Sequence, residues 1–505
     1  MCKPKLAVAL ACLLLAACGG DQDSNPAEVV SFDLWQPGDI STTPETSPEP
    51  ETKTPDSPFP EDFIVSFIYK GMVPNENTDK SDLYIVDSAG ENPMAPGVKA
   101  PLALTPFAID PDACQLVLAK KADGTPLTTA PCSCNLGCTI DDTLTWIAVT
   151  VEKPSANGFA FQIGKFNAEL QVQMVKGSVF QNIVDLAFTA GYLYFSQVKY
   201  CHETGCQYLV YRYDLENIPE PQSQFLIPPD GDPDLVDGQA TTDGHFIAAD
   251  DGQTLAFISP TIRSARVYVW RQGQIKELDY LCPGGMQGDH CTGSGSNFSD
   301  LDPLALSHNG KKLSWFMQGP DGLELRFYDT DLGTLRKLTL MDTTGKDFAT
   351  ESCSQILGND WKFNTVTEPR FTDNDDGLVF IASSHCDTQK RPYTDVVKLP
   401  VATIETGNLQ QHTIKNLTNN PRVDSLENTI ILTWDLSPDG GNIAYAASPI
   451  YDGTGKELSP SSANANKSRE LWVADLQGNQ KKQITYNAKY TSTWVKTLTS
   501  SAVKP

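Results

Sequence analysis

Ten cysteines in this chain have the spacing of disulfide partners rather than of metal ligands. The sequence holds 13 cysteines, of which Cys2, Cys12 and Cys18 lie near the N-terminus. Three of the other ten stand beside a histidine, but none has the paired C-x-x-C spacing of a zinc site. An even number of cysteines at short spacings is typical of disulfides in an oxidising compartment, and we expect no bound metal. The ten are Cys114, Cys132, Cys134, Cys138, Cys201, Cys206, Cys282, Cys291, Cys353 and Cys386.

Local loops suggest partners for four of these cysteines. Cys201 and Cys206 enclose four residues, and Cys282 and Cys291 enclose eight, so each pair closes without a long excursion of the chain. The four cysteines between residues 114 and 138 can pair in three ways, and spacing alone does not decide between them. Of these we prefer Cys114–Cys132 with Cys134–Cys138.

The other candidate groups lack the spacing that catalysis or cofactor binding requires. The chain has no G-x-S-x-G nucleophile elbow, and the Ser- and Gly-rich stretch 291–300 is interpreted as a loop. Asp230, Asp232 and Asp234 follow calcium-loop offsets, but the glycine and the final acid of such a loop are missing. The six histidines share no motif. We therefore expect no catalytic residues and no cofactor.

The N-terminus indicates export and lipid anchoring. Basic residues precede a short apolar run that ends in LLAAC at Cys18. Residues 1–17 are predicted to be a lipoprotein signal peptide and Cys18 to be acylated, which would hold a soluble domain on a membrane. The alternative is ordinary signal cleavage nearby, with Cys18 a spare thiol. Because Gly19 follows, rather than the aspartate that retains lipoproteins at the inner membrane, we expect the outer membrane, on its periplasmic or its surface side.

A tether separates this anchor from the folded part. Residues 18–62 are rich in Pro, Thr, Ser and Glu, as in STTPETSPEPETKTPDSPFPED, and have few apolar residues to offset the entropy of ordering. The formal net charge of the chain is −25, and loss of Lys3 and Lys5 with the signal peptide makes it more negative. Such acidity argues against nucleic acid and anionic lipid as partners.

From residue 63 to residue 499 one unit recurs. Its best copy is LTWDLSPDGGNIAYAAS followed by SRELWVADLQGNQKKQIT, and a second is LALSHNGKKLSWFMQGPDGLELRFYDTDLGTLRKLT. Short apolar strands alternate with Asp-Gly and Asn-Gly turns, and helical periodicity is almost absent. Four antiparallel strands per repeat predict an all-β chain folded as a β-propeller. First strands are expected near Phe107, Leu186, Phe246, Leu304, Pro369, Trp434 and Trp494.

The last of these strands explains how the ring closes. The first unit begins at its second strand, and the orphan strand STWVKTLT at residues 492–499 is available to complete it. Pairing of the two chain ends removes the open edges of the terminal units. We expect seven four-stranded blades, with six as the alternative should residues 105–180 not form a blade. Residues 500–505 are a short C-terminal tail.

The repeat resembles that of the TolB-like β-propellers over residues 63–499. LSPDGGNIAYAAS and SRELWVADLQGNQKKQIT carry the resemblance. It implies the fold but not a function, because the same repeat occurs in periplasmic scaffolds, peptidase accessory domains and sugar-acting lyases. The chain differs from TolB itself by its predicted acylation, by the tether in place of a small α/β domain and by its expected seven blades.

The loops predict a binding face. Residues 71–81, 201–206, 452–468 and the loop at Cys386 join second to third strands, which brings them to the same face as the blade-to-blade connections 281–300 and 341–364. This shared face also makes Cys353–Cys386 a candidate disulfide. Aspartates at the opposite turns are expected to serve turn geometry, namely Asp110, Asp112, Asp373, Asp375 and Asp439.

Two functions follow from this organisation. We expect a monomeric, non-enzymatic envelope lipoprotein that binds a protein or a glycan through the face with the long loops. The alternative is a propeller enzyme that acts on polysaccharide or peptide through channel-lining residues, since histidines and arginines of different blades can meet only in the fold.

Overall fold

A computed structural model describes the folded part of the chain in segments. These are residues 63–72, 79–95, 97–99, 101–104, 115–120, 126–131, 138–152, 159–168, 170, 172–189, 191–202, 205–215, 223–227, 246–261, 264–280, 304–319, 322–339, 365–385, 392–407, 413–420, 429–449, 470–485 and 492–499. The predicted signal peptide, Cys18, the tether and the C-terminal tail lie outside them. Within the described residues no helix is long and apolar enough to cross a membrane.

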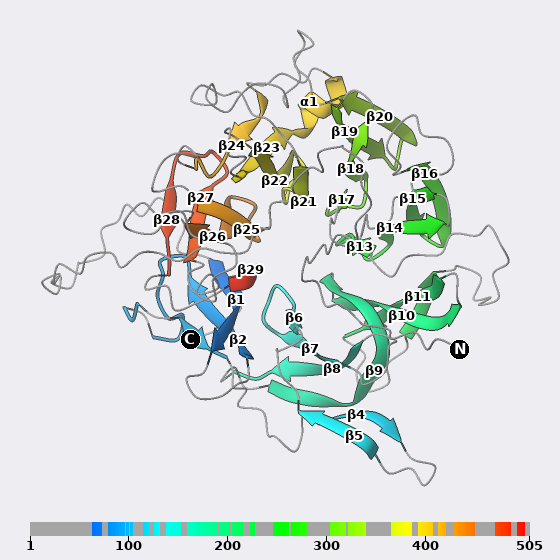
Figure 1. Cartoon of the computed structure of the whole chain (residues 1–505), viewed down its shortest axis with the longest axis vertical. Coiled ribbons are helices and arrows are strands. Elements are labelled where there is room, and N and C mark those ends of the chain that lie inside the picture. Colours follow the sequence, from blue (N-terminus) through cyan, green and yellow to red (C-terminus); the bar gives the residue numbers. More distant parts are fainter. Residues whose placement is uncertain are drawn as a thin grey trace, which may run out of the picture.

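The described strands form the predicted β-propeller, a ring of sheets around a common axis (Figure 1). Four sheets have four consecutive strands each. Their strands are β13 (Phe246–Ala248), β14 (Thr254–Thr261), β15 (Ser264–Arg271) and β16 (Gln274–Tyr280); β17 (Leu304–Leu306), β18 (Lys312–Gly319), β19 (Gly322–Asp329) and β20 (Thr334–Thr339); β21 (Thr365–Phe371), β22 (Gly377–His385), β23 (Pro392–Pro400) and β24 (Lys415–Asn416); and β25 (Thr429–Leu436), β26 (Asn442–Pro449), β27 (Glu470–Asp475) and β28 (Lys481–Gln483).

Both chain ends build the closing blade, as predicted. Its strand order is β29 (Ser492–Thr499), β1 (Phe63–Met72), β2 (Asp79–Asp87) and β3 (Leu102–Ala103). β29 runs antiparallel to β1 from Phe63 opposite Thr499 to Tyr69 opposite Ser492. The Ser66 hydroxyl donates to the Lys496 carbonyl at 2.9 Å across the same pair of strands. The orphan C-terminal strand is therefore the inner strand of the first blade.

The remaining large sheet changes the blade count. It holds seven strands, β6 (Cys138–Ile140), β7 (Trp146–Glu152), β8 (Phe159–Phe166), β9 (Val172–Thr189), β10 (Tyr192–His202), β11 (Gly205–Asp214) and β12 (Ser223–Ile227). Among the described residues there are thus six sheets of four or more strands, which correspond to six blades. This is the alternative blade count from the sequence, and the favoured count of seven was wrong.

β9 is the reason that two expected blades form one sheet. Its first part pairs with β8, and its last part, from Ile183 to Thr189, pairs with β10. Asn182, at a φ of 62°, lies where the pairing changes partner, and such a residue lets a strand bend without ending. β6 is the edge strand of this sheet and lies toward the middle of the ring (Figure 1). The strand expected near Phe107 lies outside the described residues, and β4 (Gln115–Lys120) and β5 (Pro126–Pro131) form a separate hairpin.

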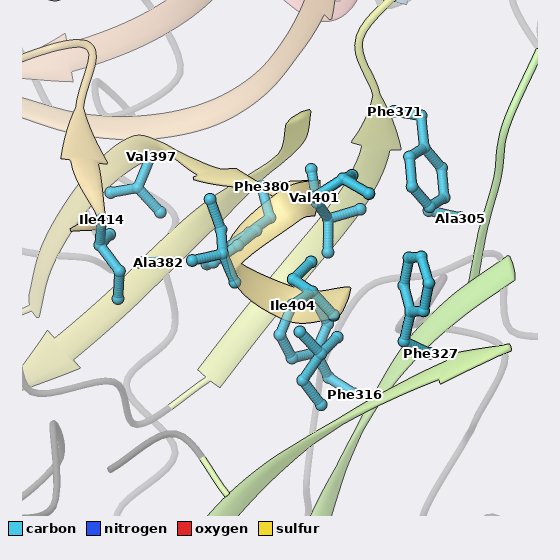
Figure 2. Close-up of a cluster of buried hydrophobic side chains, with 13 residues drawn as sticks. Ala305, Phe316, Phe327, Phe371, Phe380, Ala382, Val397, Val401, Ile404 and Ile414 are labelled. Carbon is cyan, nitrogen blue, oxygen red and sulfur yellow. The ribbon is translucent and has the colours of Figure 1, made fainter. Parts of the chain in front are cut away.

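Apolar clusters between neighbouring layers hold the ring together. One packs the β17–β20 blade against the β21–β24 blade through Phe316, Phe327, Phe371 and Phe380, all nearly inaccessible to solvent (Figure 2). Another packs the closing blade against β25–β28, and a further one packs it against β6–β9. Because each layer buries apolar residues on both faces, most strand positions are hydrophobic, which explains the near-continuous apolar runs in the sequence.

One short helix is a feature that the sequence did not indicate. α1 (Val401–Thr406) follows β23 and buries Val401 and Ile404 in the cluster of Figure 2. It ends at Gly407, whose φ of 72° is the left-handed conformation that commonly terminates helices. Six residues are too few to produce a helical periodicity, so pattern analysis had no signal to find.

The Ile/Leu-Thr signature at the end of each unit has a structural role. The Thr418 hydroxyl donates to the buried Asp395 carboxylate and accepts a bond from the Val396 backbone N–H at 3.1 Å. Thr485 repeats the arrangement in the next blade, with Glu470 at 2.6 Å and the Leu471 N–H at 2.9 Å. The hydroxyl therefore joins the fourth strand to the start of the third and satisfies polar groups in the core.

Candidate functional site

The two ends of the strands give the propeller two different faces. The tight-turn face is the end of the propeller where the first strand of a blade connects to its second strand, and the third strand to its fourth. The first-to-second-strand turns there include residues 249–253, 307–311, 372–376 and 437–441. The long-loop face is the opposite end, where second strands lead to third strands and blades connect. Most of the long loops that the sequence singled out lie outside the described residues, including 73–78, 281–303, 340–364, 386–391 and 450–469. The described polar contacts between neighbouring blades lie mostly on the tight-turn face.

The backbone of the predicted cysteine loops is described in part. Residue 201 lies directly opposite residue 206 in the β10–β11 hairpin, which is the register that a Cys201–Cys206 bridge requires. Cys138 begins β6. The other predicted disulfide positions lie outside the described residues, namely Cys114, Cys132, Cys134, Cys282, Cys291, Cys353 and Cys386, as do Asp110, Asp112, Asp230, Asp232 and Asp234.

A hydroxyl side chain organises several turns of the tight-turn face. Ser437 accepts a bond from the Asn442 N–H at 2.9 Å and donates to Asp439, which itself accepts the Gly441 N–H at 3.0 Å. Ser307 does the same with Lys312 and Asn309. Asp439 thus serves turn geometry, as the sequence predicted for it.

Asp375 and Asp373 do more than shape their own turn. Asp375, at a φ of 57°, accepts the backbone N–H of His308 from the preceding blade at 3.0 Å. Asp373 packs against Gly440 of the next blade, where an added Cβ would come within 2.7 Å of the Asp373 Cβ. Both aspartates therefore fix the position of a neighbouring turn.

Side-chain bonds extend this contact around the ring. The Thr189 hydroxyl at the end of β9 donates to one carboxylate oxygen of Asp250, in the β13–β14 turn. Nδ1 of His308, in the β17–β18 turn, lies 2.6 Å from the other oxygen of Asp250. Together with the bond from His308 to Asp375, these contacts link four successive turns. These four turns are consequently held as one pre-formed surface rather than as independent loops.

His308 is a cation within this surface. The hydrogen bond to Asp250 raises the pKa of His308 to about 9, against the opposing effect of burial. For Asp250, burial alone would raise the pKa. The hydrogen bonds from His308 and Thr189 outweigh this effect and hold the pKa of Asp250 below its usual value. At neutral pH the ring is therefore an imidazolium, which donates hydrogen bonds and is a poor general base. Its side chain is 40% exposed.

A second charged pair lies on the inner strands. Nη1 of Arg370 on β21 donates to Asp435 on β25, and its guanidinium stands 5.5 Å from the ring centre of the buried Trp434. In the next blade, Nζ of Lys496 on β29 reaches the Ile140 carbonyl at 2.6 Å and Asp142 at 2.8 Å. Each pair joins two neighbouring layers near the axis. No group of three or more His, Cys, Asp or Glu residues suited to a metal ion occurs in the described part of the chain.

Sequence inspection missed the pairs of His308 with Asp250 and of Arg370 with Asp435. Their members are 58 and 65 residues apart, so no local motif connects them. The missed signal is the repeat length of about 60 residues, because equivalent positions of consecutive units meet in adjacent blades.

No protein-family model matches the chain, and no curated protein matches it. Among solved structures, it is similar to TolB from Acinetobacter baumannii, at 13% identity, 71% coverage of this chain, 67% of that chain and a TM-score of 0.37. It is also similar to a putative TolB from Agrobacterium tumefaciens, at 12% identity and a TM-score of 0.32, and that match covers 60% of this chain and 80% of the other. An acylaminoacyl peptidase from Pyrococcus horikoshii is 9% identical with a TM-score of 0.42; the match covers 84% of this chain and 51% of the peptidase.

Proposed function

We propose that this protein is a non-enzymatic, lipid-anchored binding protein of the outer membrane whose propeller holds a protein or glycan partner at its long-loop face. The observation that carries the proposal is the difference between the two faces. On the tight-turn face, the described polar side chains are largely engaged with one another, as in the linkage from Thr189 through Asp250 to His308. The longest connections of the chain all start and end on the opposite face.

Rigidity supports a binding role. Closure by β29 fixes both chain ends, and cross-blade bonds such as those of Lys496 to Ile140 and Lys482 to Ala89 tie neighbouring layers. A rigid ring lowers the entropy that long loops lose when they contact a partner, because their ends are already held. Binding residues are commonly carried on loops of such a scaffold.

The experiment is site-specific photo-crosslinking in intact envelopes with the full-length protein. A photoreactive amino acid replaces Asp321 between the paired Gly319 and Gly322, at the long-loop end of β19, or Leu332, at the tight-turn end of the same strand. We expect one specific adduct from position 321 that excess untagged protein competes away, and none from position 332. Adducts from position 332 alone would contradict the proposed binding face.

The anchor is tested in the same cells. Cys18→Ser is expected to release the protein from the membrane fraction or to leave its signal uncleaved, since the acylated thiol is the proposed attachment. A Cys18→Ser protein that is cleaved and still firmly membrane-bound would contradict the anchor. Outer-membrane location is tested by density-gradient separation of the wild-type envelope.

The second candidate function is a propeller enzyme acting on polysaccharide or peptide. What favours it is the presence of two cationic side chains, His308 and Arg370, on adjacent blades near the inner strands. Both are neutralised by a carboxylate, and the raised pKa of His308 suits hydrogen-bond donation rather than proton abstraction. Turnover across a glycan and peptide panel that falls sharply in Arg370→Gln, without loss of folding, would favour this function over the first.

A further inference from the structure

The large apolar side chains that the structure describes as exposed all lie on the tight-turn face. They are Met94, Val98 and Leu332, with 42%, 49% and 75% of their surfaces exposed. Met94 and Val98 belong to the connection from β2 to β3, and Leu332 belongs to the turn between β19 and β20. Both connections join a third to a fourth strand. These two blades lie on opposite sides of the ring, so the side chains are spread across the face rather than gathered in one patch (Figure 1).

The described part of the chain also begins on this face. Phe63, the first described residue, is opposite Thr499 at the end of β29, where the other blades have their first-to-second-strand turn. The Ser88 N–H donates to the Phe63 carbonyl at 3.2 Å, which places the start of the β2–β3 connection beside it. The chain preceding Phe63, which carries the predicted anchor, is therefore attached next to the loop of Met94 and Val98.

We propose that the tight-turn face lies against the lipid surface, with Met94, Val98 and Leu332 contacting the headgroup region, and that the long-loop face points away from the membrane. This inference rests on the proposed anchor at Cys18. A flexible chain of the length of residues 18–62 spans roughly 35 Å on average. In this orientation the tether joins Phe63 directly to the bilayer, whereas in the opposite one it must first pass around the blade.

Charge restricts the kind of lipid surface. Asp142 and Asp250 are exposed on the same face, as is Asp373. Carboxylates are repelled by anionic headgroups within about a Debye length, close to 8 Å at physiological ionic strength. Single exposed apolar side chains are common on protein surfaces, so the proposal depends on their shared face and on the tether, not on hydrophobicity alone. The expected surface is zwitterionic.

The test uses the full-length acylated protein on phosphatidylcholine vesicles that contain a headgroup nitroxide lipid. A fluorescent amino acid replaces either Leu332 or Asp321, which flank the two ends of β19. Eight strand residues separate these positions by about 26 Å along the strand. We expect quenching by the nitroxide to be several-fold stronger at position 332 than at position 321. Equal quenching, or stronger quenching at position 321, would overturn the orientation.

Sedimentation of the same samples separates this inference from the anchor. Protein that fails to pellet with the vesicles refutes the anchor and, with it, the orientation. Protein that pellets but is quenched equally at both positions refutes the orientation alone. Replacing Leu332 with the fluorophore removes one of the three side chains, so the apolar contact is tested at the other two.

A matched pair of variants tests the apolar contact itself. Met94→Glu with Val98→Glu is expected to reduce quenching at position 332 to less than half while the pellet fraction is unchanged, because the acyl anchor remains. Lys99→Glu changes the net charge by the same amount beside these residues without removing an apolar side chain, and is expected to leave most of the quenching. Equal loss in both variants would show that charge, not apolar contact, sets the orientation and would overturn the role of Met94 and Val98.

Discussion

Phe63 and Thr499, 436 positions apart in the sequence, face each other in the closing blade. Their pairing makes the stability of the whole ring depend on a strand of eight residues at the end of the chain. β29 contributes Leu498, which is fully buried, to the cluster between the closing blade and β6–β9. Without it, β1 would become an open edge, and the inner position of that blade would be empty.

Deletion of residues 490–505 is therefore expected to destabilise the entire propeller. Loss of one buried leucine typically costs about 2–5 kcal/mol, and the deletion removes a whole strand as well. The measurement is thermal unfolding followed by circular dichroism. Deletion of residues 500–505 is the control, because it leaves β29 complete. Melting temperatures that coincide for wild type and the longer deletion would refute closure by β29.

The repeat pattern predicted the closure correctly because it follows from local signals. Asp-Gly turns and alternating apolar strands mark each unit, and the start of a unit at Ser492 without a continuation identifies the orphan strand. The blade count failed because residues 172–189 were expected to divide between two blades. Their chain bends at Asn182 and remains one strand, a choice made by pairing with β8 and β10 that local propensity does not encode.

The polar contacts of the tight-turn face were predicted only within a turn. Asp439 follows its turn type, and that much is readable from the residues Ser-Pro-Asp-Gly. The partners of Asp375 and Asp250 come from other blades, so their roles depend on how far each turn reaches around the axis. The reach of a turn toward the next blade depends on the assembled ring and cannot be predicted from the residue spacing within one unit.

The pair of His308 and Asp250 predicts a stability contribution that depends on pH. Because the pKa of His308 is raised from 6.5 to about 9 on folding, the contribution is complete below pH 6.5 and is lost as the pH rises through 9. A double-mutant cycle with His308→Gln and Asp250→Asn is expected to give a coupling of about 0.2–1 kcal/mol at pH 6, the range of exposed ion pairs. Urea unfolding at pH 6 and pH 10 measures it.

The coupling should vanish at pH 10, where the imidazole is neutral in both states. As a control, Arg271 and Asp331 form an exposed pair of the same kind between adjacent blades, with the atoms 2.8 Å apart. Arginine stays protonated at pH 10, so the coupling of that pair should persist there. A coupling of His308 that persists equally at pH 10 would contradict the charged interaction.

Replacing Thr418 is predicted to lower the free energy of unfolding by more than replacing Thr406. Thr418→Val keeps the shape of the side chain but removes the donor to buried Asp395 and the acceptor of the Val396 N–H. Asp395 still accepts the Asn420 N–H at 2.9 Å, but it loses one donor, and the Val396 N–H loses its hydroxyl acceptor; unmade buried hydrogen bonds of this kind cost about 1–3 kcal/mol. Thr418→Ser, which retains the hydroxyl, is expected to recover most of this loss. Thr406→Val, on the exposed side of α1, should change the free energy of unfolding by less than about 0.5 kcal/mol.

The described backbone register bears on one disulfide prediction, Cys201–Cys206. Residues 201 and 206 are directly opposite in an antiparallel pair, where Cα atoms are about 4.5–5.5 Å apart, within the range that a disulfide spans. Gln115 pairs with Pro131 in the β4–β5 hairpin, but Cys114 and Cys132 lie outside the described residues, so Cys114–Cys132 stays a prediction. Cys134–Cys138 then remains as the local pair.

Non-reducing peptide mapping of the protein purified from the envelope decides these pairings. We expect the peptides of Cys201 and Cys206 to be joined to each other, and those of Cys114 and Cys132 likewise. Cys201→Ser with Cys206→Ser should leave the melting temperature nearly unchanged, because the bridge closes only a short hairpin that backbone pairing already holds. Cys201 found free, or linked to a cysteine outside β11, would mean that the hairpin register does not determine its partner.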